Sequence, residues 1–227
     1  MPNKNREAFF RAQGIPAEKV YSLFQVHSRD VFTLGNPNPA VFPSLPLPEA
    51  FAREGDGMVC FSGNAYCAVT VADCLPVFLL DTENGFFAIV HSGWKGTGIV
   101  VNALDIMRQA GSRLPAIAAV LGPCIQDCCY KVDEERAKNF EAEFGPSMLK
   151  NYKSGSDIFS LGDVSRHDHS GWYIGLQVAN ARLLAASGVQ HIAYCTDCTF
   201  TDTRLGSFRR EGPETYTRMI AMIAPEQ

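Results

Sequence analysis

The chain has 227 residues, of which 46% are hydrophobic and 19% are charged. This composition is that of a globular protein, and the length suits one large domain with a single core. The formal net charge is −4, and lysines and arginines form nothing larger than pairs such as Arg209 and Arg210. Because a polyanion-binding face needs clustered positive charge, we expect no nucleic-acid partner.

The opening residues, MPNKNREAFFRAQG, are polar and then amphipathic. No later window holds the roughly 18 apolar residues that a membrane span needs, and no signal peptide is apparent. We therefore expect a cytoplasmic protein with no membrane association. In that compartment the eight cysteines stay reduced, so burial, metal binding or catalysis is expected of them rather than disulfide formation.

In chain order, the first predicted elements are a helix over residues 5–13 and a strand over 20–26 that ends at His27. The proline-rich stretch 35–51 predicts a long surface loop. Four short β-branched or aromatic runs between residues 57 and 90 predict consecutive strands, and the sequence TENG predicts a hairpin turn between the last two.

The second half of the chain alternates between helical and strand patterns. Apolar periodicity predicts helices over 97–110, 133–144 and 172–187, and the runs AIAAVLG, VQHIAYC and TYTRMIAMI predict strands. The alternation is too irregular for a βαβ repeat, and at least one hairpin is antiparallel. The predicted class is therefore α+β with a mixed sheet.

Three candidate metal ligands each follow an apolar run. LFQVH ends in His27, VTVADC ends in Cys74, and FFAIVH ends in His91. Residues at strand ends are held rigidly and still face a cleft. Two imidazoles and one thiolate suit Zn²⁺, and three protein ligands leave a fourth position for water, which is the pattern of catalytic sites.

Each of these residues has a simpler explanation when it is taken alone. Cys74 could be a small buried hydrophobe, and the two histidines could be hydrogen-bonded surface or core residues. No compact HxxxH or paired CxxC motif anchors the set. The occurrence of all three in the same kind of position nevertheless favours the metal site.

A glycine-rich turn follows His91 directly. Gly93, Gly96 and Gly98 would let backbone amides approach a bound anion at the start of the next helix, and Lys95 would add a positive charge. A plain strand-to-helix turn explains the same glycines, because glycine readily adopts positive φ.

Two further residues are candidates for the same site. Cys124, at the end of a buried strand, could be a thiol nucleophile, a substrate contact or inert packing. Asp73 could orient a ligand histidine or cap a turn.

The remaining cysteine candidates are Cys128, Cys129, Cys195 and Cys198. Four cysteines could form a structural zinc site. Two adjacent cysteines are poor geometry for two ligands of one ion, so we do not expect this site.

Six motifs, in chain order, make the sequence similar to the YfiH family: QVHS, VADCLPVFLLD, AIVHSGWKGTG, LGPCIQDCCYKV, ANARLLAASGV and SFRR. The resemblance runs from about residue 20 to the end of the sequence. Members of the family are described as polyphenol oxidoreductases (laccases), purine nucleoside phosphorylases and peptidoglycan editing factors. The resemblance implies a layered α/β/β/α fold distantly similar to toxin-type cysteine hydrolases. It also implies zinc ligation by His27, Cys74 and His91.

The sequence departs from the family pattern in three places. Family members usually begin with extra strands that carry an arginine in a TRxGG motif, so we expect a single YfiH-like domain over 1–227 that lacks them, with Arg209 or Arg210 in the anchoring role. Gln126 stands where a glycine usually follows GPCI, and PETYTRM replaces the final TGR segment.

The leading functional hypothesis is a zinc-dependent purine nucleoside enzyme. Such an enzyme would cleave adenosine, inosine or methylthioadenosine with phosphate, and would deaminate adenosine. A purine nucleoside and phosphate, the latter near Lys95, are the expected partners, and a homodimer is left open.

Three alternatives belong to other classes. A copper-dependent polyphenol oxidoreductase of the multicopper type needs about ten histidines, and this chain has five. A metal-free cysteine hydrolase, for example an amidase that edits peptidoglycan precursors, would use Cys74 or Cys124 as the nucleophile. A non-catalytic metal-binding protein would keep the ligands without turnover.

Overall fold

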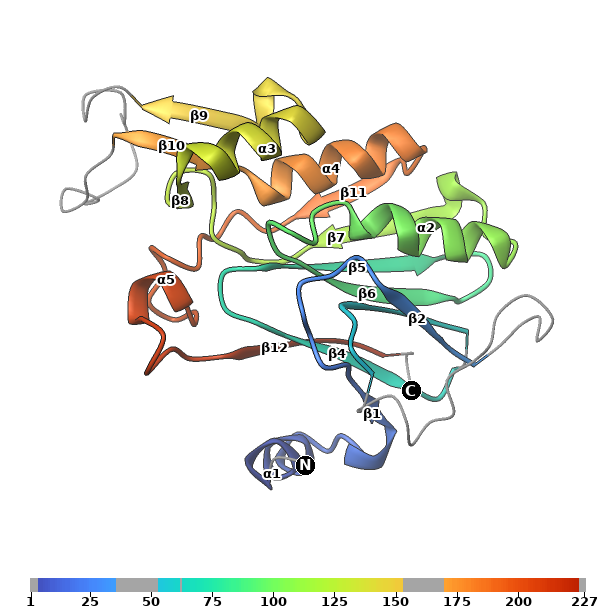
Figure 1. Ribbon diagram of the computed structural model, residues 1–227. Helices are drawn as coiled ribbons and strands as arrows, with labels where there is room; N and C mark the ends of the chain where they lie inside the picture. Colours follow the sequence, from blue (N-terminus) through green and yellow to red (C-terminus); the bar gives the residue numbers. More distant parts are fainter. Residues whose placement is uncertain (1–3, 36–52, 62, 153–169, 225–227) are drawn as a thin grey trace.

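The computed structural model describes residues 4–35, 53–61, 63–152 and 170–224. The proline-rich stretch predicted as a loop lies, apart from Gly35, outside the described residues. The described elements stack in four layers, namely a helix, a small sheet, a large sheet and a pair of helices (Figure 1). This is the predicted α/β/β/α arrangement of the α+β class.

The large sheet has six strands in the order β11-β7-β5-β6-β3-β2. The four central strands pair antiparallel, whereas the two edge strands pair in parallel with their neighbours, so the predicted mixed sheet is confirmed. Its strands are β2 (Val31–Leu34), β3 (Gly57–Cys60), β5 (Leu75–Asp81), β6 (Phe87–Ser92), β7 (Ile117–Leu121) and β11 (His191–Tyr194).

Two smaller sheets complete the β structure. One packs against the large sheet and has the order β1-β4-β12, and the other is an antiparallel sheet with the order β8-β10-β9. Their strands are β1 (Val20–Tyr21), β4 (Tyr66–Val71), β12 (Met219–Ile223), β8 (Lys131–Val132), β9 (Leu149–Tyr152) and β10 (Gly171–Ile174).

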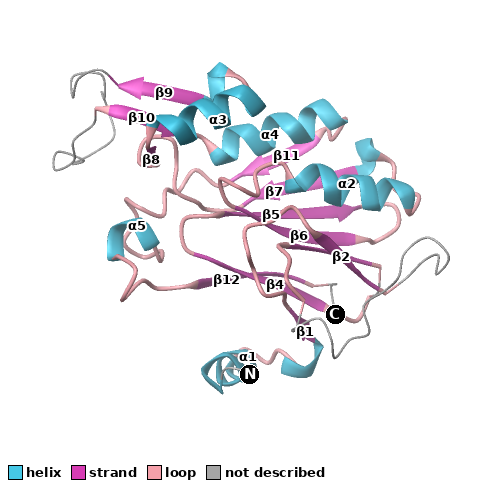
Figure 2. Ribbon diagram, in the orientation of Figure 1, coloured by secondary structure: helices cyan, strands magenta, loops and turns pink. Residues whose placement is uncertain are grey.

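Two helices, α2 and α4, cover one face of the large sheet, and the β1-β4-β12 sheet lies against its other face (Figure 2). The first helix, α1, reaches the outer side of that small sheet, where Phe10 packs against Val20 and Ala68. No helix in the described part of the chain combines the length and apolar character that crossing a bilayer requires. The helices are α1 (Lys4–Ala12), α2 (Ile99–Gln109), α3 (Glu134–Phe144), α4 (Leu176–Ser187) and α5 (Phe208–Glu211), with 3-10 turns at Ala17–Lys19, Leu114–Ala116 and Pro146–Met148.

The main core lies between the large sheet and its two helices. In α2, Val100, Ala103, Leu104 and Met107 are buried at the predicted i, i+3, i+4 and i+7 positions. Full burial of a side chain such as Leu104 stabilises the fold by about 1.5–3 kcal/mol. The large sheet is therefore a rigid base for the residues at its strand ends.

The strand predicted over 20–26 is wrong beyond Tyr21, where β1 ends. The side chain of Gln25 explains the difference, because it takes the place of a main-chain partner. Its Nε2 donates to the Thr70 carbonyl at 2.9 Å, and its Oε1 accepts from the Thr70 amide at 2.8 Å. The backbone after Tyr21 pairs instead with residues 53–55, where Phe24 forms an isolated bridge with Glu54.

The helix predicted over 172–187 is wrong in its first turn. Residues Gly171–Ile174 form β10, and α4 begins only at Leu176. The run Trp172, Tyr173 and Ile174 is aromatic and β-branched, which favours a strand, and Gly175 separates it from the helix as the N-cap.

Candidate metal centre and active site

The structure brings the three predicted ligands together. The ligand atoms of His27, Cys74 and His91 all lie within 4.8 Å of one another, and the two imidazole centres are 5.0 Å apart with their planes at 68°. We call these three residues the His-Cys-His group. His27 is exposed, Cys74 is partly buried and His91 is buried, so the group is accessible from the side of His27.

The three ligands are only partly placed at the strand ends that the sequence predicts. His91 lies on β6, one residue before its end, and Cys74 lies in the connection between β4 and β5. His27 does not end a strand but sits in a loop with φ of 61°, a left-handed conformation. Such a conformation in a residue other than glycine persists where surrounding contacts hold it.

Asp56 supplies those contacts, and sequence reasoning missed it. Its Oδ1 lies 2.7 Å from Nδ1 of His91, and its Oδ2 accepts from the amides of Ser28 and Val26 at 2.7 and 3.2 Å. One fully buried carboxylate therefore orients His91 and fixes the loop on both sides of His27. The available signal was an acidic residue between two glycines directly before an apolar strand.

Charge interactions within the group shift two pKa values. Burial raises the pKa of the Cys74 thiol, but hydrogen bonds from His27 and His91 outweigh it and lower the value to about 7. Burial lowers the pKa of His91, but its hydrogen bonds to Asp56 and Cys74 outweigh it and raise the value to about 9. Without a metal, the group thus favours a thiolate beside an imidazolium.

The glycine turn after His91 packs against the group. A Cβ atom on Gly93 would lie 2.8 Å from Cδ2 of His27 and 3.0 Å from Sγ of Cys74, and one on Gly96 would lie 2.7 Å from the Ser28 carbonyl oxygen. Gly98, the N-cap of α2, has φ of 99°. Close approach and positive φ therefore account for these glycines.

The turn offers fewer free backbone amides for an anion than the sequence predicts. The amide of Ile99 donates to the Gly96 carbonyl and that of Val101 to the Gly98 carbonyl, each at 3.0 Å, so two amides at the helix start are already used. Lys95 is exposed, with its ammonium 5.6 Å from the centre of the Trp94 ring. Phosphate binding by Lys95 and Gly93 stays a prediction.

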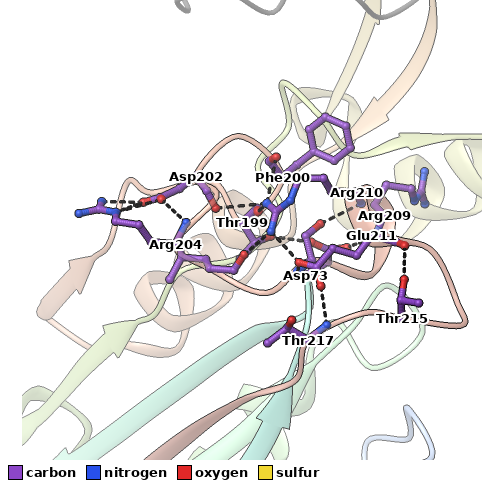
Figure 3. Close-up of polar contacts among 12 residues, drawn as sticks. Asp73, Thr199, Phe200, Asp202, Arg204, Arg209, Arg210, Glu211, Thr215 and Thr217 are labelled. Carbon is purple, nitrogen blue, oxygen red and sulfur yellow. Dashed lines mark hydrogen bonds and ion pairs between the residues drawn. The ribbon is translucent and has the colours of Figure 1, made fainter.

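Asp73 does not contact a ligand histidine through the hydrogen bonds of its carboxylate. Its Oδ1 accepts from the Thr199 hydroxyl at 2.6 Å, and its Oδ2 accepts from the Arg209 amide at 2.7 Å (Figure 3). The residue has φ of 86°, so it turns the chain immediately before Cys74. Asp73 therefore ties the Cys74 loop to the C-terminal segment, and the carboxylate bonded to His91 is Asp56.

The two arginines differ in availability. The Arg210 guanidinium donates to the carbonyls of Thr199, Phe200, Asp202 and Leu205, as Figure 3 shows in part, so it holds the C-terminal loop together.

Arg209 is exposed and lies over the Tyr130 ring, 5.2 Å from its centre. Its Nη1 donates to the Lys131 carbonyl at 2.7 Å. Of the two arginines proposed as substrate anchors, Arg209 is the accessible one.

Cys124 is fully buried, and burial raises the pKa of its thiol well above the ordinary value. A thiol is a poor nucleophile until it ionises. The structure therefore places Cys124 in the core cluster behind the site, where packing explains it.

The donor set fits a zinc ion. Zn²⁺ takes imidazole nitrogen and thiolate sulfur, and a carboxylate commonly accepts the second N–H of a ligand histidine, as Asp56 is placed to do. With three protein ligands, a fourth position is left for water or substrate.

Comparisons with known proteins agree with this fold. The chain is 29% identical to a purine nucleoside phosphorylase of Corynebacterium glutamicum over 210 residues, which cover 92% of this chain and 76% of the relative. It is 29% identical to a purine nucleoside phosphorylase of Deinococcus radiodurans over 222 residues, with 97% and 76% covered.

The crystal structure of YlmD from Geobacillus stearothermophilus has the same fold, with a TM-score of 0.77 at 24% identity, and the match covers 98% of this chain and 79% of that one. The hypothetical protein YfiH of Bacillus licheniformis gives a TM-score of 0.76 at 24% identity, with 98% and 80% covered. The family described as multi-copper polyphenol oxidoreductase laccase matches residues 3–226, and the chain therefore belongs to this family, as its resemblance to YfiH proteins implied.

Proposed function

We propose that the chain is a zinc-dependent purine nucleoside phosphorylase that also deaminates adenosine. The observation that carries the proposal is the His-Cys-His group with Asp56 behind it. The relatives named purine nucleoside phosphorylase support the substrate class.

Phosphorolysis breaks the bond between ribose C1′ and the purine nitrogen and forms a bond from C1′ to a phosphate oxygen. Zinc would supply a Lewis acid with an open coordination position at His27, Cys74 and His91. The exposed Lys95 and Arg209 offer positive charge to the anionic co-substrate. Asp56 keeps Nε2 of His91 available by holding Nδ1.

The test is to incubate zinc-loaded protein with adenosine, with and without phosphate, and to separate the products. Adenine and ribose 1-phosphate report phosphorolysis, whereas inosine and ammonia report deamination. We expect Cys74→Ala to lose both zinc and activity, and Cys195→Ala, which changes a cysteine outside the group, to keep both. Absence of all these products from zinc-loaded wild-type protein would reject the proposal.

A second candidate is a metal-free cysteine hydrolase such as a peptidoglycan-editing amidase. It is favoured by the lowered pKa of Cys74, about 7, next to two imidazoles, because a thiolate paired with histidine is the nucleophile of such enzymes. Zinc would then inhibit, and alkylation of Cys74 would proceed in step with inactivation.

A copper-dependent polyphenol oxidoreductase is suggested by the description of the family. Two imidazoles and a thiolate also suit copper. Dioxygen uptake with phenols after copper loading, lost in His91→Ala, would favour this activity. Stoichiometric zinc without turnover of any of these substrates would indicate a non-catalytic metal-binding protein.

A further inference from the structure

A second group of metal-ligating side chains lies outside the His-Cys-His group. The sulfur atoms of Cys128, Cys129 and Cys198 lie within 4.8 Å of one another, and those of Cys128 and Cys129 are 3.4 Å apart. We call these three residues the sulfur cluster. The family description speaks of several copper ions but names no residues, and the names of the relatives mention no metal.

A tight turn explains how two adjacent cysteines reach the same place. The amides of Cys129 and Tyr130 both donate to the Gln126 carbonyl at 2.9 Å, and the Lys131 amide donates to the Cys129 carbonyl at 3.0 Å. The backbone thus curls through Cys128 and Cys129, and their side chains come out side by side. In this turn two adjacent cysteines can therefore face the same ion, contrary to what their adjacency in sequence indicates.

The third thiol arrives from a distant part of the chain. Cys198 forms an isolated parallel bridge with Cys124, and its sulfur accepts from the Gln126 amide at 3.4 Å. It is buried, with 7% of its surface exposed. An amide directed at sulfur is the kind of outer contact that stabilises a metal-bound thiolate.

The remaining cysteine, Cys195, is not in the cluster. Its thiol donates to Asp197 Oδ2 at 2.8 Å, and no histidine or carboxylate joins the three sulfurs in the metal-ligand group that the described residues form. Within the part of the chain that the structure describes, the donor set is therefore three sulfur atoms. A four-cysteine zinc site was not expected from the sequence, and Cys195 lies outside the group.

We propose that Cys128, Cys129 and Cys198 form a second metal site, which takes the soft ion Cu(I) as three thiolates. Soft thiolate donors select Cu(I), which is readily three-coordinate. Structural Zn²⁺ sites, by contrast, are almost always closed by four protein ligands. Binding forms three Cu–S bonds, and each thiol that starts protonated releases its proton to solvent, with no change in oxidation state.

A bound ion would join two segments that both contact Asp73. The Ile125 amide, next to the cysteine turn, donates to the Asp73 carbonyl at 2.9 Å, and the Thr199 hydroxyl donates to the Asp73 carboxylate at 2.6 Å. Cys74 follows Asp73 directly. The sulfur cluster is therefore connected, through the contacts of Ile125 and Thr199 with Asp73, to the loop that positions Cys74.

The test is anaerobic titration of the reduced protein with Cu(I), with ascorbate keeping the copper reduced and zinc already bound at the first site. We expect one equivalent of Cu(I) to be retained after gel filtration, with a near-ultraviolet thiolate-to-copper absorption band. Cys198→Ser should lose that equivalent and the band. The matched control Cys195→Ser, three residues away in the same segment, should keep both.

A second measurement covers the case in which Cys198→Ser fails to fold. In wild-type protein, one equivalent of Cu(I) should slow alkylation of Cys128, Cys129 and Cys198 together at least tenfold relative to Cys195, as read by peptide mass spectrometry. Unchanged Cu(I) retention in folded Cys198→Ser, equal loss in Cys195→Ser, or uniform alkylation rates would each overturn the proposal. Cys74→Ala keeps the sulfur cluster, so this test is separate from that of the nucleoside activity.

Discussion

The His-Cys-His group and the sulfur cluster both bring metal-ligating side chains together, but different contacts hold those side chains in place. In the first, two imidazoles and a thiol come from three separate segments, and a buried carboxylate, Asp56, holds two of those segments. In the second, three thiols come from one turn and one bridge, and a backbone amide points at one sulfur. A charged side chain thus positions the ligands of the first group, whereas the backbone positions those of the second.

This difference predicts which substitutions change metal binding at each group. A charged partner can be removed by changing one side chain, whereas a backbone amide cannot. The first group should therefore respond strongly to residues that are not ligands, and the sulfur cluster should respond mainly to loss of a cysteine.

The largest effect outside the ligands is expected for Asp56→Asn. The amide nitrogen that replaces one oxygen must face either His91 or the Ser28 and Val26 amides, all of which can donate, so one side loses its acceptor. Loss of such a partner typically weakens metal binding about 10–100-fold. Competition with a chromogenic chelator should show this loss for zinc, while Cu(I) retention by the sulfur cluster is unchanged.

A smaller effect is expected for Gly93→Ala. Its Cβ would lie 2.8 Å from His27 and 3.0 Å from Cys74, so both ligands must shift. Overpacking typically costs about 1–3 kcal/mol, and zinc affinity should fall by about two- to tenfold if half of that cost acts on the bound state. Gly63→Ala is the matched control, because nothing lies within 4 Å of that position. Equal affinities for the two variants would show that the close approach is not a constraint.

Thr199→Val probes the framework between the two groups. The variant removes the hydroxyl that donates to Asp73 and keeps the side-chain shape. We expect the free energy of unfolding to fall by about 1–3 kcal/mol, as when a buried acceptor loses its hydrogen-bond partner. Thr199→Ser, which keeps the hydroxyl, should lose less in urea unfolding. The reverse order would argue against this role of the hydrogen bond.

The smallest effect is expected from Glu211→Gln, and it is present at neutral pH and disappears in acid. Hydrogen bonds from the amides of Thr217 and Ser207 lower the pKa of Glu211 from 4.5 to about 2. Its stabilisation is therefore fully present above pH 4.5 and is lost as the pH falls towards 2. Thermal unfolding should show a shallower loss between pH 4.5 and 3 in the variant than in the wild type, with metal binding at neutral pH unaffected.

Local patterns predicted most of the fold. The core strands and α2 are visible as apolar runs and as the spacing of Val100, Ala103, Leu104 and Met107, because burial of those side chains dictates the elements. The end of β1 could not be predicted, since it depends on the Gln25 side chain reaching Thr70, which is 45 residues away.

The candidate site shows the same division. The ligand types at residues 27, 74 and 91 could be selected from sequence, and the structure brings them together. Asp56 could not, because its value lies in contacts with residues 28 and 35 positions away. The sulfur cluster could not be predicted, because adjacency in sequence does not show how tightly the backbone turns between Gln126 and Tyr130.

The shared carboxylate of Asp56 has a consequence for how the two ligand imidazoles can vary. Loss of the His91 side chain frees a carboxylate that also fixes the backbone on both sides of His27, so changes at positions 27 and 91 should not act independently. A double-mutant cycle across His27 and His91 is expected to show a coupling energy well above that of two separately supported ligands. Replacing the two histidines one after the other is therefore a difficult way to change the metal preference of this centre.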